Sequence, residues 1–443
     1  MANPPVLAPH QMGPPVNFTA AGADNTKVQA NQIQARNSPA FPFVKELFAN
    51  AISKRTATIM LDYTQQAVNI RFDVDGMWHN IGQRDRQSGD AMLMVMKKLA
   101  DLNVNERRAK QSGTFKAEFM DQKVTCKFSS QGVKTGERVL IKMEGKGAKV
   151  DTLEDLGMRA KMIEQVKSLL NNESGGMVIV AAMPGDGLTT TYCATLRAAD
   201  RFMRDFVGFE DQNNRTPPIE NVEMKMFDSS AGQTPDALLP SVLLKQPEAF
   251  AFPELFNGKT IDLLTDQVVR NQCTVVTAIN AKEAVEALLR VMMLKPNVEQ
   301  FAKAVTAVLY TRPARRLCET CRQPYQPAPQ MLQKLGLPPG RVNVLYRQWQ
   351  PPPPEQLVDE KGNPIAPPIC PSCGGLGYKG RFGIYELLMV SDQMRQAMIK
   401  QPKLEVLRQI AMAAKHRTVK DEGIAAAARG VSSLNEIQRV LQK

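Results

Sequence analysis

The chain contains 443 residues, which at about 100–200 residues per domain predicts two or three domains. Hydrophobic residues make up 43% of it and charged residues 23%. These values are typical of globular proteins and exclude wholesale disorder, collagen-like repeats and coiled-coil rods. The 56 Lys and Arg against 44 Asp and Glu give a net charge of +12, which suits an anionic partner such as a phosphate ligand, nucleic acid or a membrane surface.

The sequence carries no membrane-spanning or secretory signal. Its longest uncharged apolar run, residues 177–183, is far shorter than the about 20 residues that a spanning helix needs. The N-terminus has no basic stretch followed by an apolar one, so we expect no signal peptide. Four of the seven cysteines form two Cys-x-x-Cys pairs, which suits a reducing compartment. We therefore expect a cytoplasmic protein.

Residues 1–40 are rich in proline, carry few charges and show no apolar period, which predicts a disordered tail. Residues 41–150 combine helical and strand patterns and predict a small α+β lobe. Within this lobe, residues 68–74 alternate apolar and polar side chains, and Asp75-Gly76 follows them as a hairpin signal. A helix is expected around residues 92–99 and further strands at 115–119, 124–128 and 138–143.

The next segment, residues 151–317, predicts an α/β domain. Its continuous apolar strand at 177–182 is typical of a sheet covered on both faces. A glycine-containing turn and a helical stretch up to Arg204 follow, and further buried strands are expected at 249–252 and 274–279. Residues 318–390 hold the two cysteine pairs around a proline-rich excursion at 325–369. Residues 391–443 are expected to be helical, with Ser433 and Glu436 as a capping box for the last helix.

The turn after the 177–182 strand resembles a phosphate-binding loop, G-x-x-x-x-G-K-[ST]. Glycines let backbone amides converge on phosphate, and the following helix adds positive potential. The candidate nucleotide-binding residues here are Gly185, Asp186, Gly187, Leu188, Thr189 and Thr190. Ala182 replaces the first glycine, and Leu188 replaces the lysine that would meet the β- and γ-phosphates. Taken alone, the segment is better explained as an ordinary tight turn between a core strand and a helix.

Three further groups of residues could carry chemistry. Cys318, Cys321, Cys370 and Cys373 have the spacing of a structural zinc site, with unrelated reduced pairs or redox-active pairs as the alternatives. Glu210 and Glu254 follow buried strands, where an NTPase keeps magnesium ligands and water-orienting groups, although a solvated strand end is the commoner case. Arg107-Arg108, Arg138 and Arg315-Arg316 could clamp phosphate or lie on a solvated face.

Taken together, residues 41–443 resemble the type II secretion and type IV pilus assembly ATPase family. The matching segments are 71–76 (R-F-D-V-D-G), 105–113 (N-E-R-R, then Q-S-G), 136–139 (G-E-R-V) and 315–321 (R-R-L-C-E-T-C). The most specific one is 370–388, which is close to the family's C-x-x-C-x-G-x-G-Y-x-G-R-x-G-I-Y-E-L-L. A chance match of that length is implausible.

This resemblance implies a PAS-like N-terminal lobe before a RecA-like P-loop domain with a zinc-binding insertion and a helical C-terminal region. It also implies a homo- or hetero-hexameric ring at the inner membrane, serving secretion or pilus platform components, with ATP and Mg²⁺ as cofactors beside structural Zn²⁺. Carried over by position, Glu210 would orient the attacking water and Glu254 would be the Walker B glutamate. Arg107 and Arg108 would reach towards phosphate from the small lobe.

The departures from the family pattern concentrate at the catalytic positions. Leu188 replaces the Walker lysine, Pro253 the glycine before the Walker B glutamate, and Asn280 the histidine of the histidine box. Phe256 and Lys245 stand where arginines are usual. A lost charge-assisted contact weakens nucleotide binding by about tenfold to a hundredfold, at roughly 1.5–3 kcal/mol. Removal of an electrostatic stabiliser of the transition state costs on the order of 10²–10³ in rate.

The leading hypothesis is therefore a secretion or pilus ring subunit with weak or lost ATP hydrolysis. The second is an active motor in which Lys245 or Lys259 replaces the missing charge. The third is a basic zinc protein that binds nucleic acid. This last hypothesis lacks a basic groove interleaved with aromatic residues, so we expect no nucleic-acid partner.

Overall fold

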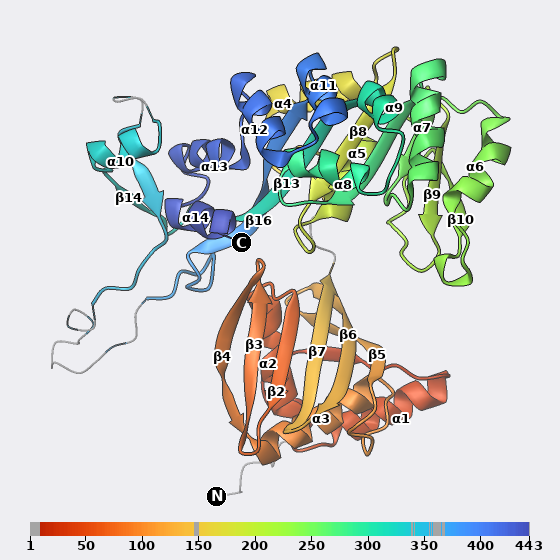
Figure 1. The fold of residues 1–443 in the computed structure, drawn as a ribbon. Helices are drawn as coiled ribbons and strands as arrows, with labels where there is room; N and C mark the ends of the chain where they lie inside the picture. The colour runs from red at the N-terminus through yellow and green to blue at the C-terminus, as the bar shows by residue number, and fades with distance from the viewer. Residues whose placement is uncertain are drawn as a thin grey trace, which may run out of the picture. The chain divides into compact units, whose positions relative to one another are not determined.

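The computed structural model describes residues 9–145, 150–337, 340, 342–353, 355, 357, 365 and 368–442. The chain divides into two compact units. Residues 1–149 and 368–376 form the first, here called the N-terminal unit. Residues 150–367 and 377–443 form the second, here called the C-terminal unit. The two units are drawn in Figure 1.

The N-terminal unit is an antiparallel sheet with helices packed against it (Figure 1). The strand order is β1-β5-β6-β7-β2-β3-β4. The strands are β1 (Asn17–Thr19), β2 (Thr58–Tyr63), β3 (Ala67–Val74), β4 (Met77–Asp85), β5 (Gln111–Phe119), β6 (Gln122–Val133) and β7 (Gly136–Gly145). The helices are α1 (Asn25–Arg36), α2 (Phe41–Ser53) and α3 (Arg86–Leu99). Buried and partly exposed residues alternate along β2 and β3, so one face of the sheet carries the core.

The predicted local patterns of this unit are confirmed. Residues 68–74 fall in β3, and Asp75 and Gly76 turn the chain into β4 with φ angles of 53° and 80°. Two successive positive φ angles match the twist of a tight hairpin, which explains why glycine occupies the second position. The strands predicted at 115–119 and 124–128 form the antiparallel pair β5–β6, and the expected helix and last strand are α3 and β7.

The N-terminal tail requires a correction, because residues 17–36 form β1 and α1. Phe18 is only 4% exposed, and its ring packs edge-on against those of Phe41 and Phe48. The carboxylate of Asp24 caps α1 by accepting from the Lys27 amide at 2.7 Å. Phe18 is buried by residues that lie elsewhere in the chain. The pattern of apolar residues within 1–40 does not reveal such partners. Residues 1–8 of the predicted tail lie outside the described residues.

The C-terminal unit contains a seven-stranded sheet in the order β10-β9-β11-β12-β8-β13-β16, parallel except for β16. The strands are β8 (Gly176–Ala182), β9 (Phe206–Asp211), β10 (Val222–Phe227), β11 (Ala249–Phe252), β12 (Thr274–Asn280), β13 (Val305–Leu317) and β16 (Tyr378–Met389). The main helices are α4 (Ala160–Leu170), α5 (Leu188–Arg197), α6 (Pro235–Leu243), α7 (Gly258–Asn271), α8 (Ala284–Met292), α9 (Val298–Ala304), α11 (Asp392–Lys400), α12 (Leu404–Ala413), α13 (Val419–Ala428) and α14 (Leu434–Gln442).

Helices cover both faces of this sheet, as the continuous apolar strand predicted. Met177 and Ile179 of β8 join the core beneath α7 and α8, whereas Val178 and Val180 join the core beneath α4 and α5. Every residue of β8 is buried. The fold of the unit is therefore an α/β layered structure, and the carboxyl ends of its parallel strands meet at one edge.

The segment that carries the four paired cysteines is partly regular. The second half of the expected zinc element forms β16, which pairs with β13 in the main sheet. Part of the proline-rich excursion is regular, as β14 (Gln323–Tyr325), α10 (Pro329–Lys334) and β15 (Leu345–Arg347), while much of 338–367 lies outside the described residues. No helix of the described ranges is both long and apolar enough to cross a bilayer.

Candidate functional site

The phosphate-loop segment forms a tight turn between β8 and α5. Gly185 and Gly187 have φ angles of 81° and 85°, and Gly187 is the residue that caps α5. A side chain at either glycine would meet open space, so the backbone conformation, rather than crowding, requires glycine there. The Asp186 amide bonds the Met183 carbonyl at 3.0 Å and closes the turn. The predicted order of strand, glycine turn and helix is confirmed.

A pocket of about 890 Å³ opens over this turn at the carboxyl ends of β8, β11 and β12. It is lined by Pro184, Gly185, Gly187, Leu188, Thr189, Thr190, Asn214, Pro253, Glu254, Leu255, Ala278, Ile279, Asn280, Arg290, Met293 and Leu294. This set includes every predicted loop residue except Asp186. Ligands of open α/β sheets bind at this edge, so the pocket is the strongest candidate for a ligand site.

The charge of the pocket is the feature that decides its chemistry. Among the lining residues that the structure describes, Arg290 alone carries positive charge. Its guanidinium Nε donates to Oε1 of Glu286 at 2.9 Å, so this cation is engaged in an ion pair on the surface of α8. Sequence reasoning did not single out Arg290, because an Arg four residues after a Glu on a helix is indistinguishable from an ordinary surface pair.

The two predicted carboxylates occupy different surroundings. Glu254 follows β11, is exposed and lines the pocket, where Nδ2 of Asn214 donates to it at 3.4 Å. Glu210 is 6% exposed near the end of β9, and its Oε2 accepts from the amide and the hydroxyl of Thr216 at 2.9 and 2.8 Å. Glu210 does not line the pocket, so its carboxylate holds the loop that follows β9.

Neither lysine that could replace the missing charge lines this pocket. Lys245 is exposed beyond the end of α6. The ammonium of Lys259 lies 3.3 Å from the carboxylate of Asp236. A hydrogen bond from Asn257 is the main reason that the pKa of Asp236 falls to about 2, with Lys259 contributing against the opposing effect of burial. Lys259 is therefore engaged with an ionised partner.

Arg107 and Arg108 lie in the N-terminal unit, between α3 and β5. They line a separate pocket of about 660 Å³ with Arg86 and Lys134. Nη1 of Arg107 lies 3.8 Å from Asp90, and Glu137 also lines this pocket, so acids offset part of its basic character. Both arginines line this one pocket, as expected of neighbours in the sequence. Their part in phosphate binding stays a prediction.

The four paired cysteines come together. The sulfur atoms of Cys318, Cys321, Cys370 and Cys373 all lie within 4.8 Å of one another. Cys318 and Cys373 are buried, whereas Cys321 and Cys370 are partly exposed. A tetrahedral zinc ion at about 2.3 Å from each sulfur needs sulfur atoms roughly 3.8 Å apart, so the donor set and its spacing fit zinc.

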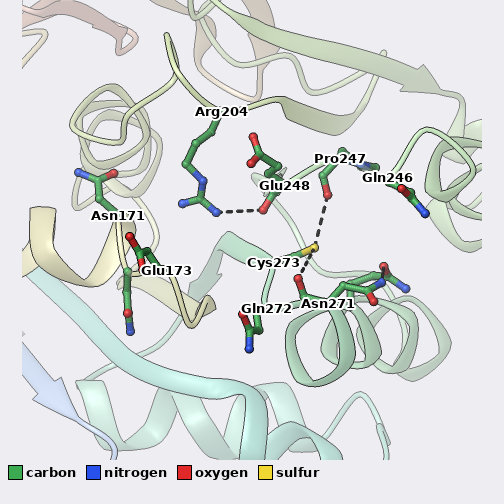
Figure 2. A pocket seen from close by; sticks show the side chains of 11 residues that line it. Asn171, Glu173, Arg204, Gln246, Pro247, Glu248, Asn271, Gln272 and Cys273 are labelled. Carbon is green, nitrogen blue, oxygen red and sulfur yellow. Dashed lines mark hydrogen bonds between the residues drawn. The ribbon is translucent and has the colours of Figure 1, made fainter.

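The three remaining cysteines, Cys126, Cys193 and Cys273, are free and buried. Burial raises the pKa of Cys126 to about 12 and that of Cys193 to about 11, so both thiols stay protonated at neutral pH. Cys273 lines a second pocket of about 580 Å³ at the amino ends of β8, β11 and β12 (Figure 2). There Arg204 donates to the Glu248 carbonyl and Cys273 to the Pro247 carbonyl, so both side chains hold the wall together.

Comparisons with known proteins bear on the family. Residues 34–439 match a family model described as Type II/IV secretion system protein. The chain is 24% identical over 411 residues to "Type IV pilus assembly ATPase PilB" of Thermus thermophilus, covering 91% of this chain but only 43% of that protein. It is 25% identical over 407 residues to "Type II secretion system protein E" of Klebsiella pneumoniae, covering 92% of this chain and 77% of that protein.

Among solved structures, the fold is similar to that of the ATPase DotB of Legionella pneumophila. The TM-score is 0.54 at 9% sequence identity, and the similarity covers 90% of this chain and 95% of that one. At this identity the likeness concerns the fold alone, and it supports a RecA-like architecture for the C-terminal unit beside a smaller α+β unit.

Proposed function

Because the chain belongs to the type II/IV secretion system protein family, we propose that it is a subunit of a secretion or pilus-like assembly machine that binds nucleotide weakly and hydrolyses ATP slowly or not at all. The single observation that carries this proposal is the charge of the pocket over the turn. Its one lining cation in the described residues, Arg290, is paired with Glu286, and Leu188 stands where the loop lysine would.

The remaining parts of a phosphate site support binding rather than turnover. The first turn of α5 lies in the pocket wall, so its free backbone amides and the helix potential are available to an anion there. Thr189 and Thr190 line the same pocket, and a hydroxyl from either would be a ligand for Mg²⁺ carried by a nucleotide. These groups bind phosphate without the point charge that stabilises the transferring phosphoryl group, so affinity falls by about tenfold to a hundredfold and the rate by on the order of 10²–10³.

The carboxylates divide between the pocket and the surrounding loop. Glu254 is exposed within the pocket, where it would meet Mg²⁺ or the attacking water of a bound nucleotide. Glu210 is bonded to Thr216 and would have to leave this partner before orienting water. We therefore assign Glu254 the direct role and Glu210 a positioning role, both in a weakened site.

The experiment is ATP titration by calorimetry, with and without Mg²⁺, beside an assay of phosphate release from the full chain. We expect weak binding and phosphate release so near the assay background that Glu254→Gln can lower it only slightly. Motor-like turnover that Glu254→Gln abolishes would overturn the proposal and favour an active motor. The control is Glu164→Gln, an exposed carboxylate on α4 outside the pocket, which should leave both measurements unchanged.

The assembly and its place in the cell are part of the same proposal. Family membership supports a homo- or hetero-hexameric ring in the cytoplasm that contacts inner-membrane platform components. A soluble ring of this kind would act through its shape and through active partner subunits, since its own nucleotide site is impaired. Light scattering of the purified chain, alone and with an active family member, tests it. A monomer under both conditions would contradict the ring.

We also propose that the four-cysteine cluster binds one structural Zn²⁺. Four thiolates and a span of 4.8 Å or less support zinc over a pair of redox-active dithiols. The zinc ion would tie the segment after β13 to the segment before β16. Metal analysis of the purified chain should give about one zinc per chain, and a chain that folds identically without metal would contradict the structural role.

A further inference from the structure

The turn between β8 and α5 carries an acidic side chain at its centre. Asp186 stands between the two left-handed glycines, Gly185 and Gly187, in the segment where a phosphate-binding loop presents its amides. Its side chain is only 12% exposed, so it does not extend freely into water. A carboxylate at this position places negative charge beside the start of α5, where a phosphate would gain from the same helix potential.

The carboxylate is directed to one buried cation. Nε of Arg312 on β13 lies 3.5 Å from Oδ2 of Asp186, and the arginine side chain is 7% exposed. The register explains this position, because Thr311 pairs with Ala182, the last residue of β8, and Arg312 is therefore next to the turn. Nη2 of Arg312 also contacts the sulfur of Met183 at 3.0 Å, at the start of the same turn.

Arg312 is otherwise poorly satisfied. Its Nε is buried and has no hydrogen-bond partner within the described ranges, so the acid at 3.5 Å is its principal compensation. Buried guanidinium groups are costly without an anion. Arg312 is thus a buried cation beside the turn, and Asp186 is its ion-pair partner.

We propose that Asp186 is an internal anion that excludes nucleotide phosphate from this turn, acting beside the missing lysine charge. This inference rests on the proposed weak nucleotide site and names a residue that determines its ligand preference. Replacing Leu188 alone would leave the carboxylate in place and restore binding only in part. Removing the carboxylate would take away a negative charge beside the turn and leave the positive charge of Arg312 there uncompensated.

The test is a cycle of Asp186→Asn, Leu188→Lys and the double variant, each titrated with ATP and Mg²⁺ by calorimetry. We expect Asp186→Asn to tighten binding about tenfold in the Leu188→Lys background, which corresponds to about 1.4 kcal/mol. Arg312→Gln added to the double variant should abolish most of this gain. Asp200→Asn, a matched neutralisation of an exposed acid after α5, should leave the affinity unchanged, and thermal unfolding confirms that each variant is folded.

The outcomes separate this inference from the function on which it rests. Tight ATP binding and brisk turnover by the unmodified chain would overturn the proposed function. A gain below twofold from Asp186→Asn, or an equal gain from Asp200→Asn, would overturn the role of Asp186 even if the unmodified chain binds ATP weakly. Weaker binding of Mg²⁺-ATP by Asp186→Asn would identify the carboxylate as a magnesium ligand instead, and failure of the double variant to bind ATP would also overturn the inference.

Discussion

Glu436 provides a direct test of how the last helix is attached to the sheet of the C-terminal unit. Its side chain is fully buried in the first turn of α14. The carboxylate accepts from the amide, Nε and Nη2 of Arg315 at 3.0, 3.0 and 2.6 Å, and from Nε and Nη2 of Arg439 at 2.8 and 2.6 Å. Glu436→Gln keeps the volume of the side chain and removes its charge.

These contacts set the loss of unfolding free energy that Glu436→Gln should cause. Removing one partner of a buried ion pair costs about 3–5 kcal/mol because the remaining charge is left uncompensated. The side chains of Arg315 and Arg439 are 12% and 27% exposed, so water can solvate part of the charge that Glu436→Gln leaves behind. We therefore expect a loss at the lower end of the range, about 3 kcal/mol of unfolding free energy.

The same carboxylate predicts a pH dependence. Burial is the largest influence and raises the pKa of Glu436, but hydrogen bonds from Arg439 and Arg315 together outweigh it, so the pKa lies below its ordinary value. A lowered pKa stabilises the fold above the ordinary value of about 4.3, and this stabilisation is lost as the pH falls through the folded-state pKa. Glu436→Gln should remove this part of the acid sensitivity.

Urea denaturation followed by circular dichroism at pH 7 and at about pH 3, which lies below the ordinary pKa of a glutamate, measures both effects. The matched control is Glu405→Gln on α12, an exposed carboxylate that should change the unfolding free energy by less than about 0.5 kcal/mol. A loss below 1 kcal/mol for Glu436→Gln at pH 7, or the same loss for both variants, would refute the reasoning that the buried charge holds α14.

Three further variants test other parts of the chain. Leu188→Lys should tighten ATP binding by about tenfold or more relative to the uncharged Leu188→Met, and equal affinities would contradict the charge argument. Cys373→Ser should reduce the zinc content well below one per chain in metal analysis, whereas unchanged zinc would exclude Cys373 as a ligand. Lys97→Met strands the buried carboxylate of Glu137, 2.7 Å away, and should cost about 3–5 kcal/mol by urea denaturation. The exposed Lys116→Met should cost little, and equal losses would contradict the buried pair.

The last helix illustrates where local patterns mislead. The spacing of Ser433 and Glu436 predicted a capping box, and the Ser433 hydroxyl does accept from the Glu436 amide at 3.1 Å. The second hydrogen bond of a capping box, from the Ser433 amide to the Glu436 carboxylate, is replaced. The carboxylate instead binds Arg315, which lies 121 residues earlier in the chain. A sequence window around the helix cannot reveal a partner at that separation.

The pocket over the turn also combines residues that the sequence could identify with residues that only the fold brings together. The loop residues and Glu254 could be selected from the sequence because strand, glycine turn and helix are adjacent along the chain. The pairing of Asp186 with Arg312 could not, since it depends on β13 lying beside β8 in the sheet. Arg290 enters the pocket for a similar reason, from a helix that follows β12.

The amino-acid sequence by itself determined the hairpins, the buried strand, the glycine turn, the spacing of the cysteines and the family. Each of these depends on side-chain periodicity or on residues within a short motif. Only the tertiary structure decided that Phe18 joins a core, that Glu210 is bonded to Thr216, and that Asp186 faces a buried arginine. Burial and charge pairing between distant segments are properties of the folded chain, because they depend on which strands and helices become neighbours.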